Sequence, residues 1–105
     1  MKMMKGEPPQ SFPKSSGTLD AARAETLALQ ALAFLAQDAQ RIQKFLQLTG
    51  VEPGDLPALA PQRGFLLAVL DHFASDDELL VSFAKEIALN PEMIARARIA
   101  LGGDA

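Results

Sequence analysis

The feature that most constrains the fold is an apolar run between positions 19 and 36 that leaves only a narrow polar stripe. At the helical spacing of about 100° per residue, four polar side chains fall on one line. That line consists of Arg23, Thr26, Gln30 and Gln37. The apolar side chains that cover most of the remaining surface are Leu27, Ala28, Ala31, Leu32, Phe34 and Leu35. Because a helix with so wide an apolar arc is usually surrounded by others, the pattern predicts the central helix of a bundle or a helix at an oligomer interface.

The residue types in the rest of the chain also favour helices. The 105 residues include 18 Ala and 16 Leu, both strong helix formers, while Val occurs only three times, so a β-sheet is disfavoured. A hydrophobic content of 49% is typical of a globular chain. We therefore expect an all-α fold, a compact bundle of five or six short helices.

Capping signals mark the first two helices. We expect a helix over about residues 19–36, capped by Thr18 or Asp20. Asp38 can cap a second helix over about residues 39–48, and Gly50 is a suitable left-handed stop for it.

Further turn and capping signals divide residues 52–105 into four more helical stretches. A turn leads into a short helical piece that ends near Ala60, and Pro61 can begin a helix over residues 62–73. Ser75 and Glu78 match the capping box, which predicts a helix that continues to about Leu89. Asn90 followed by Pro91 then predicts a cap and the first residue of a last helix, which runs to Leu101.

The first 17 residues differ in composition from the rest. They contain three Pro and three Lys against one Glu, show no helical period, and are expected to form a flexible tail. Residues 18–102 are expected to form a single helical domain. The tail has no apolar segment typical of an export signal, and no stretch reaches the ~20 apolar residues of a membrane span, so we expect a cytoplasmic protein without membrane contact.

The residue inventory restricts catalysis and metal binding. Without Cys, thiolate zinc sites and cysteine nucleophiles are excluded. The one histidine, His72, follows Asp71 directly, and helix neighbours one apart do not face each other as a base and its orienting group would. The acidic residues at 71 and 76–78 lack the spacing of a calcium loop, and three of them suit a helix start. We therefore expect neither an enzyme nor a bound metal or cofactor.

Residues 83–99 look like a helix-turn-helix, which gives one hypothesis for function. Ala84 is the small residue that the motif places against its second helix, and Ala88 stands where Gly is common in the turn. The side chains that could contact DNA are Asn90, Arg96 and Arg98. The chain has 10 Lys and Arg against 13 Asp and Glu, a net charge of −3, which is not typical of a phosphate-backbone binder. A DNA-binding regulator that uses about residues 80–101 is therefore the alternative hypothesis.

The same last helix also predicts an apolar contact. Ala95 and Ile99 fall on its expected outer face, beside Arg96 and Glu92. An exposed apolar pair on a helix favours contact with another helix or chain. The leading hypothesis is therefore a non-enzymatic interaction or adaptor module that binds a protein partner or forms a homodimer.

Four segments carry a resemblance to a known family. They are residues 24–32 (AETLALQAL), 45–50 (FLQLTG), 64–71 (GFLLAVLD) and the last helix from Asn90 to Gly102. Over roughly residues 24–102 the chain resembles a family of short bacterial helical proteins classed as a domain of unknown function. The resemblance implies an all-helical cytoplasmic protein and carries over no activity, cofactor or site residue.

Overall fold

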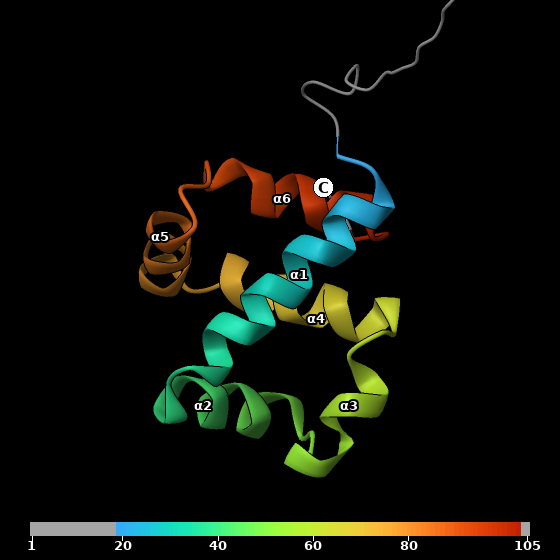
Figure 1. Cartoon of the computed structure of the whole chain (residues 1–105), viewed down its shortest axis with the longest axis vertical. Helices are drawn as coiled ribbons and strands as arrows, with labels where there is room; N and C mark the ends of the chain where they lie inside the picture. The colour runs from blue at the N-terminus through green and yellow to red at the C-terminus, as the bar shows by residue number, and fades with distance from the viewer. Residues whose placement is uncertain (1–18, 104–105) are drawn as a thin grey trace, which may run out of the picture.

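The first helix, α1 (Ala21–Ala36), crosses the middle of the fold. A computed structural model describes residues 19–103, and the expected tail over residues 1–17 lies outside them. Figure 1 shows α1 running diagonally over α4 (Arg63–Ala74), with α6 (Glu92–Ala100) on one side and α2 (Ala39–Thr49) on the other. Contacts of α1 with α2, α4 and α6 confirm the prediction of a central helix.

The remaining elements complete an all-α bundle, as expected from the sequence. A single 3-10 turn, η3 (Pro53–Asp55), and the short α3 (Leu56–Leu59) connect α2 to α4, and α5 (Asp77–Glu86) lies between α4 and α6 in the chain. Residues 19–103 contain six α-helices and no strand.

The core is built around phenylalanine rings from four helices. Phe34 of α1, Phe73 of α4 and Phe83 of α5 form a triangle with ring centroids 5.1–6.3 Å apart, while Phe45 of α2 lies 5.9 Å from Phe65. Their tilted and edge-on orientations are favourable for aromatic pairs. The buried face of α4 consists of Phe65, Leu66, Val69, Leu70 and Phe73.

Two predicted helix ends are confirmed by hydrogen bonds. Asp20, one of the two expected caps, accepts from the Arg23 amide at 2.8 Å, and Asp38 accepts from the Gln40 amide at 2.9 Å. Gly50 ends α2 with φ +74°, a backbone conformation that favours glycine. The two aspartates thus accept hydrogen bonds from otherwise unpaired backbone amides, and Gly50 turns the chain, at the positions that the sequence predicts.

Three other predicted boundaries are wrong. The helix after Pro61 begins at Arg63, because Pro61 belongs to the preceding turn and Gln62 occupies the cap position. The helix expected to reach Leu89 ends at Glu86, because the backbone at Ala88 turns left-handed. The last helix begins at Glu92, so Pro91 stands at the cap position rather than within the first turn.

The predicted capping box at Ser75 is also wrong. The side chain that caps α5 is Asp76, whose Oδ1 accepts from the Leu79 amide at 3.1 Å. Ser75 ends α4 instead, and its hydroxyl donates to the His72 carbonyl at 2.9 Å. The carboxylate one residue later takes the capping role because α4 and its terminal turn extend to Ser75.

Candidate functional site

The turn between α5 and α6 has an unusual backbone. Ala88 has φ +53° and is the only non-glycine residue with positive φ in the described part of the chain. The Leu89 amide donates to the Ala84 carbonyl at 2.8 Å, and the Ala88 amide donates to the Lys85 carbonyl at 3.4 Å. This pair of bonds forms a Schellman motif, in which the left-handed position is usually Gly. The chain therefore makes a sharp corner after α5 at the residue where the helix-turn-helix pattern expects a glycine.

The start of α6 is organised by Asn90. Its side-chain oxygen accepts from the Glu92 amide at 2.9 Å, and its carbonyl accepts from the Met93 amide at 2.9 Å. The Asn90 side chain thus accepts a hydrogen bond from the first turn of α6, as a capping residue does, although Pro91 occupies the cap position of the backbone. The side-chain oxygen of Asn90 is therefore already hydrogen-bonded within its own helix. For a contact with nucleic acid, the side chain offers mainly its NH2 group.

An apolar groove lies over this corner. Its volume is about 440 Å³, and the exposed surface that lines it is almost entirely apolar. Val81, on the exposed side of α5, is 44% exposed. The Lys85 ammonium forms no ion pair with any residue between 19 and 103. The groove is lined by Val81, Ala84, Lys85, Ala88, Leu89, Asn90 and Pro91.

The outer face of α6 has the composition expected from the sequence. Ile94 and Ala97 are buried, whereas Ala95, Arg96 and Ile99 are exposed, Ile99 to 51%. Arg96 lies 3.8 Å from the Glu92 carboxylate one turn earlier. The face therefore presents two apolar side chains beside a cation that an acid of the same helix partly neutralises.

Arg98 is placed differently from the other predicted site residues. Its Nε donates to Oδ1 of Asp71 on α4, and the Arg98 side chain is half-buried. The structure thus places Asn90, Arg96 and Arg98 in separate settings, as a helix cap, a partner of Glu92 and a partner of Asp71.

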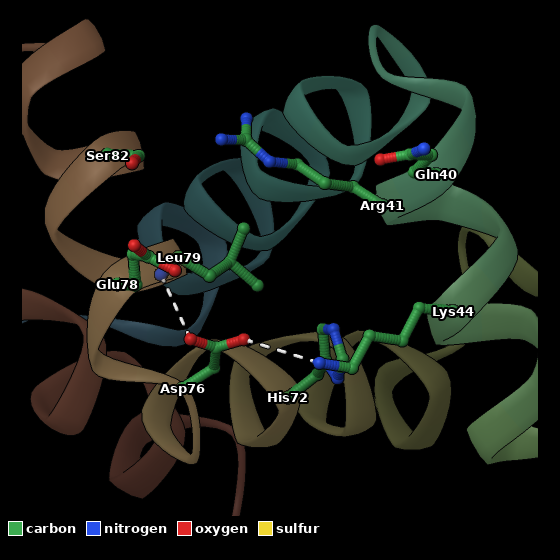
Figure 2. Close-up of a pocket in the computed structure, with 8 residues that line it drawn as sticks. All are labelled: Gln40, Arg41, Lys44, His72, Asp76, Glu78, Leu79 and Ser82. Carbon is green, nitrogen blue, oxygen red and sulfur yellow. Dashed lines mark hydrogen bonds and ion pairs between the residues drawn. The ribbon is translucent and has the colours of Figure 1, made fainter.

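A polar cleft beside the first half of α5 was not predicted from the sequence. Its volume is about 410 Å³, and Figure 2 shows its lining residues converging from α2, α4 and α5. Lys44 Nζ lies 3.8 Å from Asp76 Oδ2 across the cleft. Periodicity along one helix could not reveal this site because three helices contribute to it. It is lined by Gln40, Arg41, Lys44, His72, Asp76, Glu78, Leu79 and Ser82.

His72 lies at this cleft with its ring against two phenylalanines. Its ring centroid is 5.2 Å from that of Phe45 and 6.2 Å from that of Phe73, both in edge-on geometry. Burial lowers the pKa of His72 below its ordinary value of 6.5, and Lys44 lowers it further, while the Asp76 carboxylate raises it. Because burial dominates, the imidazole is neutral at pH 7.

Two further findings concern metals and membranes. Within residues 19–103, no three His, Cys, Asp or Glu side chains are grouped so that they could hold a metal ion. No helix in this range is long and apolar enough to cross a lipid bilayer.

These features define a small all-helical protein with an apolar groove at the α5–α6 corner and a polar cleft between α2, α4 and α5. A family model described as a protein of unknown function (DUF3572) matches residues 21–104, so the chain belongs to that family. The resemblance to a domain of unknown function, drawn from roughly residues 24–102 of the sequence, is thereby confirmed. No curated protein and no solved structure matches the chain.

Proposed function

We propose that this protein is a non-enzymatic interaction module that binds a partner protein through the apolar groove at the α5–α6 corner. The groove carries the proposal because it is concave, open to solvent and lined almost entirely by apolar surface. Exposed apolar surface of this kind is typical of protein contact sites. Ile99 and Ala95, on α6 of the same hairpin, are also exposed apolar side chains.

The chemistry of the groove specifies the partner. An apolar side chain of the partner would fill the space between Val81 and Pro91, removing apolar surface from water. Lys85, which lines the groove, favours an acidic residue next to that side chain. The expected partner segment therefore combines a large apolar residue with a neighbouring Asp or Glu.

The test compares two exposed apolar residues on different helices. Val81→Glu places a charge in the groove, whereas Leu48→Glu places the same charge on α2, where Leu48 is 67% exposed. We expect the tagged wild-type protein and Leu48→Glu to retain the same bound protein from cells of the source organism, and Val81→Glu to lose it. Equal retention by all three, or no retained protein, would contradict the proposal. Loss with Ile99→Glu alone would move the contact to the outer face of α6.

A second copy of this chain is one outcome of that test. If the partner is another copy, light scattering should show a mass that rises with wild-type concentration, and Val81→Glu should remain monomeric. Leu48→Glu should behave like the wild type.

DNA binding is the alternative proposal, and the corner itself is the observation that favours it. Ala84 is buried, and Ala88 adopts the left-handed conformation that the helix-turn-helix pattern suggests. The charges oppose it, since residues 19–103 carry 7 Lys and Arg against 11 Asp and Glu. A DNA reader should bind a mixed-sequence duplex with an affinity that falls steeply with salt. We expect no such binding in fluorescence anisotropy, and salt-sensitive binding that Arg96→Gln weakens would reverse the order of the two proposals.

A further inference from the structure

The polar cleft between α2 and α5 separates charges of opposite sign on its two sides. Arg41 and Lys44 come from α2, whereas Asp76 and Glu78 come from the start of α5. Figure 2 shows the two cationic side chains on one side and the two carboxylates on the other. The formal charges of these four groups cancel, so a ligand with a single charge would meet repulsion as well as attraction.

A ligand with both charges fits this arrangement. We propose that the cleft binds a free amino acid, with its carboxylate toward Arg41 and Lys44 and its ammonium toward Asp76 and Glu78. The volume of about 410 Å³ is within the range of small-molecule sites and leaves room for a side chain beyond the two charged groups.

The ion pair between Lys44 and Asp76, which crosses the cleft, can be replaced by ion pairs with the ligand. Lys44 and Asp76 are 3.8 Å apart, and the Lys44 side chain is 63% exposed. Exposed pairs of this kind contribute little stability, so replacing the pair with ligand charges costs little. Asp76 keeps its Oδ1 on the Leu79 amide, which holds its carboxylate in place while Oδ2 remains available.

Arg41 is oriented by a ring below it. Its Cζ lies 4.9 Å from the centroid of the Phe34 ring, a cation–π contact, and its Nε is 3.9 Å from Asp38. A guanidinium has five N–H donors, and the contacts with Phe34 and Asp38 use few of them. The remaining N–H groups of Arg41 can therefore donate to the carboxylate of the ligand.

Neutral polar groups complete the lining. His72, Gln40 and Ser82 all line the cleft. In the described part of the chain, no hydrogen bond engages the His72 ring or the Ser82 hydroxyl, so both can bond a ligand. Because His72 is neutral at pH 7, it leaves the balance of charges across the cleft unchanged.

The experiment is an amide NMR titration of the labelled full chain with each of the twenty amino acids in turn. We expect at least one to give saturable shifts confined to amides around residues 40–44 and 72–82, with a Kd of about 1 mM or tighter. For that amino acid, the N-acetyl derivative lacks the ammonium and the carboxamide derivative lacks the carboxylate. Each derivative should bind about tenfold more weakly, which is the loss of roughly one charged contact.

Matched variants locate the two charges. Lys44→Gln and Glu78→Gln should each weaken binding about tenfold, whereas Arg23→Gln on α1 and Glu86→Gln at the far end of α5, which remove charges of the same signs outside the cleft, should leave it unchanged. Circular dichroism checks that each variant remains helical. The proposal is overturned if no amino acid gives saturable shifts, if the shifts lie elsewhere, or if either derivative binds as tightly as the parent. It is also overturned if the control pair weakens binding as much as the cleft pair.

Discussion

Arg98 of α6 donates from Nε to Oδ1 of Asp71 on α4, and this ion pair joins two helices that both contact α1. The Arg98 side chain is 26% exposed and that of Asp71 is 49% exposed. A guanidinium engaged in this way lies apart from the outer face of α6. The pair therefore gives Arg98 a role in the contact between α4 and α6. The sequence pattern alone had suggested that Arg98 could contact DNA.

The energy of this pair can be measured with a double-mutant cycle. We expect Asp71→Asn and Arg98→Gln to couple by about 0.5–1 kcal/mol in urea unfolding, because both groups are partly exposed and solvent screens their attraction. The coupling should shrink in 1 M salt. Coupling of zero at low salt would mean that the pair contributes nothing to stability in solution.

The left-handed residue at the α5–α6 corner predicts a stabilising substitution. Ala88 has φ +53°, a conformation that costs a residue with a Cβ atom about 1 kcal/mol relative to glycine. Ala88→Gly should therefore raise the free energy of unfolding by about 1 kcal/mol.

The same chemical change elsewhere is the control for Ala88→Gly. Ala33 is exposed in the last turn of α1, where glycine is expected to lower stability by up to about 1 kcal/mol. Urea denaturation of the two variants should give changes of opposite sign. A loss of stability for Ala88→Gly would show that the turn does not hold this conformation in solution.

Core packing predicts a large contrast between two residues of α5. Phe83 is fully buried and lies 5.1 Å from Phe73 and 5.4 Å from Phe34, measured between ring centroids. Phe83→Ala should lower the free energy of unfolding by about 3–5 kcal/mol, because it removes a large buried side chain and leaves a cavity. Val81→Ala, on the exposed side of the same helix, should change it by no more than about 0.5 kcal/mol. Equal effects in urea denaturation would contradict the central position of Phe83.

Local signals predicted the helices well, and the errors have physical causes. Asp20, Asp38 and Gly50 act through hydrogen bonds or backbone angles within a few residues, so their roles follow from the sequence. Ser75 and Asp76 are both good caps, and the choice between them depends on where α4 ends. The position where α4 ends depends on how the whole helix packs against the others. A sequence pattern of a few residues carries no information about that packing.

The candidate sites were predicted less completely for a similar reason. The outer face of α6, with Ala95 and Ile99, follows from helical periodicity and is confirmed as exposed. The pairing of Arg98 with Asp71 and the convergence of Lys44, His72 and Glu78 on one cleft depend on how helices distant in the sequence pack together. No spacing rule along the chain links those positions.

The half-buried imidazole of His72 predicts a specific dependence of stability on pH. Burial lowers the pKa of His72 in the folded protein below 6.5, so near pH 6 the unfolded chain binds more protons than the folded one. Stability should therefore fall as pH decreases below 6.5 and continue to fall until the folded-state pKa is passed. The charged groups that face the ring are Asp76 from the start of α5 and Lys44 from α2, with opposite effects on this pKa.

His72→Gln separates this contribution from that of the carboxylates. Urea unfolding between pH 8 and pH 5 should show a loss of stability in the wild type that is smaller in His72→Gln, whereas both proteins should lose stability together at lower pH, where carboxylates protonate. An NMR titration of the His72 ring should give a midpoint below 6.5 in the folded protein. A midpoint above 6.5 would mean that the attraction of Asp76 outweighs burial, and the wild type would then gain stability relative to His72→Gln as pH falls through that midpoint.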